Sequence, residues 1–281
     1  QASTLSFDQQ SYLTQSAFYE SEGTLKTTDT TIHQSQDGSF FMDQARYSLN
    51  AQSSLNSKNP ITAVYQDLIF SLTPQNIQSS QGRLVQNTQE IDGTDNPELK
   101  NKGIIYENAY GQGTSLGIIA TPLELKKIIK LTKQASTTDL SFVIDVPQGT
   151  QFSVNDQIWD QKNPLSVQDQ FIKIQYKNSD AFIKPAKVWD SAGHEINIEL
   201  TLSKDIQGNI VLTKHLPQEW LSTAVFPVYT DATISFGTEA TFESATIEDP
   251  VVSTLDSTHV VIAYRDTGDS NKGNALLGTI S

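Results

Sequence analysis

The chain has 281 residues, of which 37% are hydrophobic and 18% charged, with a net charge of −13 and no cysteine. This length fits two or three modest domains, and the negative charge disfavours nucleic-acid binding because it repels phosphate backbones. The lack of cysteine excludes disulfides, thiolate metal ligands and thiol nucleophiles, and no apolar run approaches the roughly 20 residues that a membrane-spanning helix needs.

The polar residues are largely Ser, Thr, Gln and Asn rather than charged residues. This composition is typical of strands with one solvated face, because Thr and Ser tolerate a pleated surface. The chain begins with Gln, and its first residues lack the basic and apolar parts of a signal peptide, which predicts a removed signal peptide or a cut fragment. Together with the lack of cysteine, this predicts an exported protein, secreted or at the cell surface, of bacterial origin.

Residues 1–74 are expected to form short strands separated by polar turns, with Asp37-Gly38 as a hairpin signal. The strongest apolar stretch in this part is residues 61–72, whose mixed period fits either a pair of strands or a short helix. Residues 75–102 are polar and rich in turn formers. They predict a loop-rich connection, with one strand near residues 83–86, and a domain boundary.

Residues 103–233 carry the most regular strand signals, beginning with two strands around a glycine-rich turn at 103–120. Residues 121–124 resemble a helical capping box, whereas the apolar positions of residues 123–131 fit a strand that Lys127 interrupts. We favour the strand because its neighbours are strands. Strict alternation then follows in residues 140–146. Further strands are expected near residues 152–154, 171–176, 186–189, 195–202 and 210–213. Short strands at this spacing predict a sandwich or a barrel, and we expect an antiparallel β-sandwich.

Several different short motifs follow one another along the second two-thirds of the chain. They are residues 106–111 (YENAYG), 158–160 (IWD), 188–193 (VWDSAG), 220–221 (WL) and 226–228 (FPV), with Asp231 and Thr233. This succession resembles a β-rich module of large secreted bacterial repeat proteins, in which a Tyr-Pro-Val … Asp-Pro-Thr closing strand precedes repeats. The present chain departs from that pattern at Phe226 and Ala232.

Residues 234–281 are similar to the β-repeat units of propeller-like arrays, opening with ISFG and ending with GTIS about where a second copy would start. The resemblance implies an all-β fold, sandwich domains followed by one propeller-like repeat unit, and an extracellular location. Each such repeat buries its face only against neighbours, so a single unit is expected to be incomplete. The expected division is 1–74, 75–102, 103–233 and 234–281.

No residue is assigned a catalytic role, and the chain is predicted not to be an enzyme. The four histidines lack metal-ligand spacing, no acid lies in a recognisable motif, and the serines lie outside any nucleophile elbow. No cofactor is expected apart from calcium, for which Asp266, Asp269 and Asn271 offer oxygen ligands in the loop 266–273. The alternative for this loop is a hairpin turn, because Asp, Asn and Gly also favour turns.

Trp159, Trp189 and Trp220 form a candidate glycan-binding platform, with packing against a β core as the favoured alternative. The predicted function is that of a secreted structural or adhesive cell-surface protein that acts through subunit contacts and self-assembles into oligomers or filaments. The alternative is a carbohydrate-binding adhesin module, followed by an enzyme acting on polysaccharide. The expected partners are therefore the chain itself, other surface proteins or glycans, with neither nucleic acid nor a membrane span.

Overall fold

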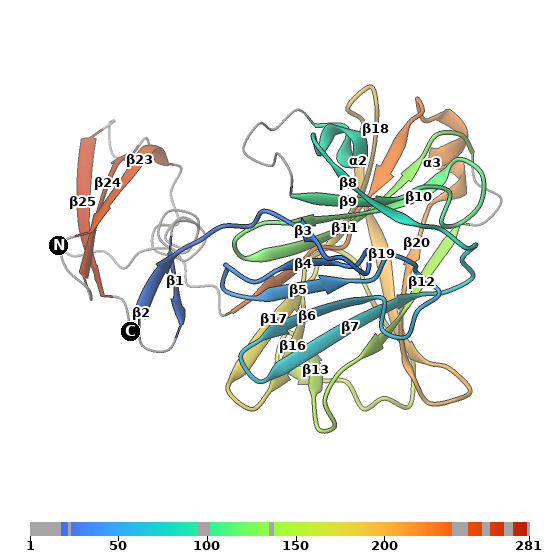
Figure 1. Cartoon of the computed structure of the whole chain (residues 1–281), viewed down its shortest axis with the longest axis horizontal. Coiled ribbons are helices and arrows are strands. Elements are labelled where there is room, and N and C mark those ends of the chain that lie inside the picture. The colour runs from blue at the N-terminus through green and yellow to red at the C-terminus, as the bar shows by residue number, and fades with distance from the viewer. Residues whose placement is uncertain are drawn as a thin grey trace.

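The computed structural model describes residues 18–21, 24–94, 102–134, 138–237, 247–254, 259–266 and 272–279. Strands dominate these residues, within which the helices are the short α2 (Gln89–Asp92) and α3 (Gln218–Thr223) (Figure 1). The all-β class expected from the sequence is therefore confirmed. Neither of the described helices has the length and apolarity that a bilayer-crossing helix needs.

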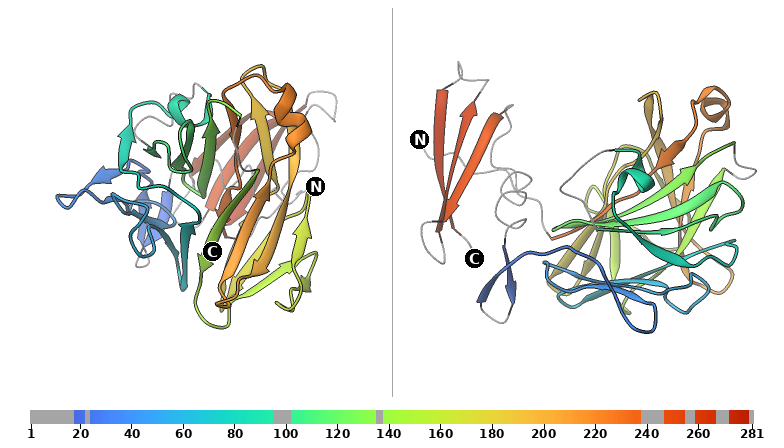
Figure 2. Two further views of the ribbon diagram at one scale, coloured as in Figure 1. Left: turned by 90° about the vertical axis from the view of Figure 1, so that its right-hand side faces the viewer. Right: turned by 45° about the horizontal axis from the view of Figure 1, so that its top comes forward.

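The strands from β3 to β22 form one closed antiparallel system that folds into two layers (Figure 2). The first layer pairs in the order β3 (His33–Gln34), β4 (Phe40–Met42), β5 (Ser48–Ala51), β6 (Ile61–Tyr65), β7 (Leu68–Pro74), β12 (Asp139–Asp145), β20 (Ile210–His215), β19 (Glu195–Lys204) and β15 (Leu165–Val167). The early strands β3 to β7 and the later strands β12, β20, β19 and β15 therefore meet in this layer where β7 pairs with β12.

The second layer is centred on β11 (Glu124–Leu131). On one side of it lie β10 (Thr114–Ala120), β9 (Gly103–Tyr106) and β8 (Gly82–Val85). On the other side β11 pairs with both β21 (Val228–Thr230) and β22 (Ile234–Phe236). Strand β21 continues to β18 (Ala186–Asp190), and β22 continues to β17 (Ser179–Ile183), β16 (Ile172–Tyr176), β13 (Gln151–Val154) and β14 (Gln157–Ile158). The segment 228–236 is thus paired on both sides.

Two connections join the layers into a closed system. Strand β19 belongs to both, because residues 195–198 pair with β18 while residues 199–204 pair with β20. On the opposite side, a bridge joins Ser54 to Gln81, and the Gly82 N–H donates to the Ser53 carbonyl at 2.8 Å. The inward side chains of both layers consequently meet in one hydrophobic core that runs from Ile32 to Phe236.

A second, smaller core lies on the outer face of β8 to β11, beneath α2. It consists of Val85, Ile91, Ile105, Ile119, Ile128 and Tyr229. Ile91 of α2 packs so closely on β10 that a Cβ atom at Gly117 would overlap its side chain. A glycine in the middle of this strand is therefore explained by the close approach of α2.

Several of the local predictions are confirmed. The glycine-rich turn joins β9 and β10, a strand occupies residues 82–85, and residues 140–146 alternate between buried and more exposed side chains. The ambiguous stretch at 61–72 is the β6–β7 hairpin, and residues 124–131 form a strand rather than a helix.

The predicted domain division is wrong in three places. Residues 26–74 are not a separate domain, because β7 pairs with β12 and both contribute to the same core. The boundary at 233/234 falls inside the large sheet, because β22 pairs with β11 and β17. Residues 75–94, expected to belong to a connection, carry β8 and α2, which are part of the second layer and its cover.

The C-terminal unit is a three-stranded antiparallel sheet of β23 (Ile247–Thr254), β24 (His259–Asp266) and β25 (Lys272–Thr279). A further hairpin consists of β1 (Phe18–Ser21) and β2 (Thr24–Thr27). A propeller blade typically contains four strands, whereas three are described here. The repeat unit is thus a β-sheet, and its propeller-like character stays a prediction.

Candidate functional site

Two lysine side chains, Lys127 and Lys214, lie inside the closed sheet with no exposed surface. Lys127 occupies an inward position of β11, and Lys214 an inward position of β20 opposite Leu140. Both positions follow directly from the alternation of these strands. Lys127 therefore does not interrupt the strand, as the sequence suggested, but continues its buried face.

Both amines bind carbonyl groups near the point where the ladder of β11 changes partner. On this side, β11 pairs with β22 at residues 124–125 and with β21 at residues 129–131, so residues 126–128 have no partner in these two strands. Lys127 Nζ donates to the Ala232 carbonyl at 2.8 Å. Lys214 Nζ donates to the carbonyls of Thr230 (3.1 Å) and Lys127 (3.4 Å). The lysines thus satisfy buried carbonyls at this break in the sheet.

The surroundings of the two amines favour their neutral forms. Burial lowers the pKa of Lys214 to about 7, although the nearby Asp231 carboxylate opposes this shift. Burial also lowers the pKa of Lys127 well below its usual value, and the charge of Lys214 adds to the effect. Within the described residues neither amine forms an ion pair with a carboxylate, and Lys127 Nζ lies 5.1 Å from the ring centre of Phe142. A neutral amine is a nucleophile, but full burial leaves no access for a substrate, so this cluster is structural.

Asp190 of the VWDSAG motif closes the turn between β18 and β19. Its buried carboxylate accepts hydrogen bonds from the backbone N–H groups of Ala192, His194 and Val225, each at 2.9 Å. Nδ1 of the His194 ring lies 3.1 Å from Asp190 Oδ2, the same oxygen that accepts from Val225. These contacts, led by the one from Val225, lower the pKa of Asp190 below its usual value. The motif therefore ties the β18–β19 turn to residue 225.

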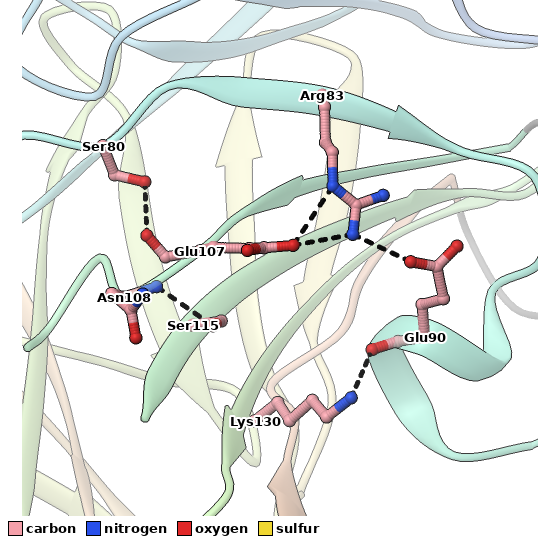
Figure 3. A network of polar contacts seen from close by, with 7 residues as sticks. All are labelled: Ser80, Arg83, Glu90, Glu107, Asn108, Ser115 and Lys130. Carbon is pink, nitrogen blue, oxygen red and sulfur yellow. Dashed lines mark hydrogen bonds and ion pairs between the residues drawn. The ribbon is translucent and has the colours of Figure 1, made fainter. Parts of the chain in front are cut away.

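A polar network on the surface surrounds Arg83 (Figure 3). Its guanidinium bridges Glu90 of α2 (2.8 Å) and Glu107 (2.7 Å), while Lys130 Nζ donates to the Glu90 carbonyl at 2.8 Å. These ion pairs raise the pKa of Arg83. Because both carboxylates are held by one guanidinium, the network fastens α2 to the sheet and does not provide a separate acid and base. Exposed pairs of this kind typically contribute up to about 1 kcal/mol to stability.

The three tryptophans of the candidate glycan platform lie in separate settings. Trp159 is buried, with its indole N–H bound to the Asn163 carbonyl at 2.6 Å. Trp189 stacks on Tyr229 with ring centres 5.8 Å apart, and Trp220 of α3 packs against the main core. Among the described residues no ring contact joins two of them. Packing against the core, the favoured alternative, therefore accounts for each indole.

The candidate calcium loop lies largely outside the described residues. Asp269 and Asn271 belong to this undescribed part, and Asp266 ends β24 opposite Lys272. Within the described ranges, no group of three or more His, Cys, Asp or Glu side chains is arranged to hold a metal ion. Calcium binding through Asp266, Asp269 and Asn271 stays a prediction.

The C-terminal sheet presents backbone edges and a small apolar row. Among the described strands, β23 and β25 each pair only with β24. Val251, Ala263 and Ala275 lie opposite one another across the three strands, and all three are exposed, Val251 by 63%. Pro250 interrupts β23 at an irregularity in its pairing, and proline lacks an N–H, so β25 has the more regular edge.

Comparison with known proteins adds no assignment to these features. No family model matches the chain, and no curated protein shows a significant match to it. The function is therefore argued from the geometry of the described residues.

Proposed function

We propose that the chain is a secreted structural or adhesive protein of the bacterial cell surface, which acts through contacts between β-sheets and self-assembles into oligomers or filaments. The observation that carries this proposal is the C-terminal sheet, whose described strands pair only with each other. An edge strand displays unpaired N–H and C=O groups, and these pair readily with a strand of another chain.

The composition and the polar clusters support the same function. A cysteine-free chain with a net charge of −13 suits an exported protein that must stay soluble with exposed strands. The buried lysines, the Asp190 turn and the Arg83 network all serve the fold. In the described part of the chain, the features that support the proposal are therefore its exposed surfaces and strand edges.

The proposal predicts association that depends on β25. We expect light scattering after size exclusion to give a mass well above the 31.0 kDa of one chain. Ala275→Lys should return the protein to a monomer, because a lysine on an exposed edge strand opposes pairing with a second strand.

Ile69→Lys is the matched control. Ile69 is also an exposed apolar residue, 51% exposed, but it lies on β7, which pairs with β6 and β12. This variant should associate like the wild type. A clean monomer of the wild-type chain, or equal association of the Ala275→Lys variant, would refute assembly through this edge.

A further inference from the structure

A hollow of about 240 Å³ opens on the outer face of the second layer, over β13, β16 and β17. Its floor is a row of side chains across these strands, because Ser153 lies opposite Lys173 and Lys173 lies opposite Phe182. The neighbouring residues of the same strands, such as Ile174, point into the main core. The row therefore faces away from the core.

Two phenylalanine rings supply the apolar surface of the hollow. Phe171 precedes β16 and is 42% exposed, and Phe182 on the floor is half-buried. Ile158 of the neighbouring β14, which lies opposite Ser153, is also exposed. Exposed apolar side chains that gather at one place on a surface often mark a binding site.

The polar groups of the hollow have unused hydrogen-bonding capacity. Asp156 and Asp169 both line the hollow and are both in the left-handed region, with φ of 63° and 60°. Neither carboxylate has a hydrogen bond or ion pair to another described residue, and the same holds for the side-chain amides of Asn155 and Gln170. The one ammonium group, Lys173, is held by Asp180 at 2.9 Å.

We propose that this hollow binds a neutral sugar unit of a glycan. A sugar ring offers apolar C–H groups that fit the faces of Phe171 and Phe182, and hydroxyls that both donate and accept hydrogen bonds. The free carboxylates accept from hydroxyls, and the amides both donate and accept. The carboxylates, together with the net charge of −13, disfavour an anionic sugar.

A basic side chain of a protein partner is the competing ligand, and it fits the hollow less completely. It would pair with Asp156 and Asp169, but it carries donors only and would leave the amide N–H donors of Asn155 and Gln170 unmatched. This inference rests on the proposed adhesive function. It adds to that function a class of ligand, and it places the binding surface away from the C-terminal sheet.

The test uses the full chain on an array of neutral hexose and N-acetylhexosamine oligosaccharides, followed by calorimetric titration of the strongest binder. We expect binding that Phe171→Ala and Asp169→Asn each weaken by about tenfold or more, a typical effect for a contact at the centre of an interface. Ile69→Ala removes another exposed apolar side chain, 51% exposed against 42% for Phe171, and should change the affinity less than about twofold. Absence of binding across the array, or binding that neither variant of the hollow weakens, overturns the proposal.

The same titration with poly-L-lysine separates the competing ligand. If poly-L-lysine binds, loses its binding in Asp169→Asn and at about 0.5 M salt, and no sugar binds, the hollow is a site for a basic protein partner and the proposal fails. Light scattering of Phe171→Ala distinguishes this site from the proposed assembly, because the variant should lose sugar binding and retain the mass of the wild type. Loss of association in that variant would contradict the separation of the two surfaces.

Discussion

The two buried amines show how lysine side chains can stabilise a β core, by donating hydrogen bonds to buried carbonyl groups. Within the main core, Lys127 and Lys214 reach three carbonyl groups that lie near the change of partner along β11. An apolar side chain at either position would remove these donors from the buried carbonyls, and each carbonyl left unsatisfied would cost about 1–3 kcal/mol. Holding a lysine in its neutral form also costs free energy near pH 7, because its amine is protonated in the unfolded chain. The hydrogen bonds to the carbonyls oppose this cost, and since the cost changes with pH, the net effect of the lysines on stability depends on pH.

The free energy of unfolding should rise with pH above neutrality because of Lys214. Its pKa is about 7 in the folded protein and 10.5 in the unfolded chain, so between these values the unfolded state binds more protons. Stability therefore increases with pH in this window. We expect Lys214 alone to contribute a gain of about 2–3 kcal/mol between pH 7.5 and 9.5, to which Lys127 adds, measured by urea unfolding. The range ends below pH 10 because Tyr47, Tyr106 and Tyr110, whose pKa values burial raises, should reverse the trend there.

Lys214→Met tests the origin of this pH dependence. Methionine keeps most of the volume of the side chain and cannot be protonated, so the variant should lose much of the gain, retaining the part due to Lys127. Lys58→Met changes an exposed lysine in the same way and should keep the full slope. An unchanged slope in Lys214→Met would show that its amine is not the titrating group.

At the scale of elements, the sequence predicts strands whose pattern is visible in adjacent residues. It does not predict features that depend on how distant strands pair. The alternation of residues 140–146 marks β12 because one face of that strand meets the core along its length. Residues 61–72 stay ambiguous, because the pairing of β7 with β12, some 70 residues away in the chain, is not visible in a local pattern. Lys127 looks like an interruption because its carbonyl partner belongs to a distant segment.

The candidate sites follow the same rule. The sequence correctly favours core packing for Trp159, Trp189 and Trp220, since isolated tryptophans beside strand ends usually cap a core. It gives no signal for the hollow, whose floor exists only because β13, β16 and β17 set Ser153, Lys173 and Phe182 side by side. The pair Asn155-Asp156 indicates a turn at this point, but a turn does not by itself predict a hollow.

Helix α2 provides a test of packing between elements. Gly117→Ala adds a methyl group that overlaps Ile91, so we expect a destabilisation of about 1–3 kcal/mol, measured by urea unfolding. Ile91→Ala removes the γ atoms, including the one that overlaps most, and leaves the Cβ atom 3.1 Å from the added methyl group. In that background the same substitution should cost clearly less than in the wild type, because the closest contact is gone. Equal costs in both backgrounds would show that α2 does not determine the residue at position 117.

At the scale of the whole molecule, the closed sheet places early and late parts of the chain in one core. Phe70 of β7 and Ile234 of β22 belong to the same cluster of buried residues, and segment 228–236 lies between β11 on one side and β17 and β18 on the other. No part of this system can lose its strands without exposing the core of the rest. We therefore expect one cooperative unfolding transition for residues 26–237, in contrast to the separate domains that the sequence suggested.

The positions of the tryptophans make this expectation measurable, because all three lie between residues 159 and 220 and none lies in the first 74 residues. Phe70→Ala removes a fully buried ring from the early part of the chain and should destabilise by about 3–5 kcal/mol. If the sheet unfolds as one unit, this variant lowers the urea midpoint seen by tryptophan fluorescence as much as the midpoint seen by circular dichroism. Ile206→Ala, at a 97% exposed residue of the late part, should move neither midpoint. A fluorescence midpoint that stays at its wild-type value in Phe70→Ala would mean that the late part unfolds on its own, since a shared core transmits the loss of a buried ring to every strand that contacts it.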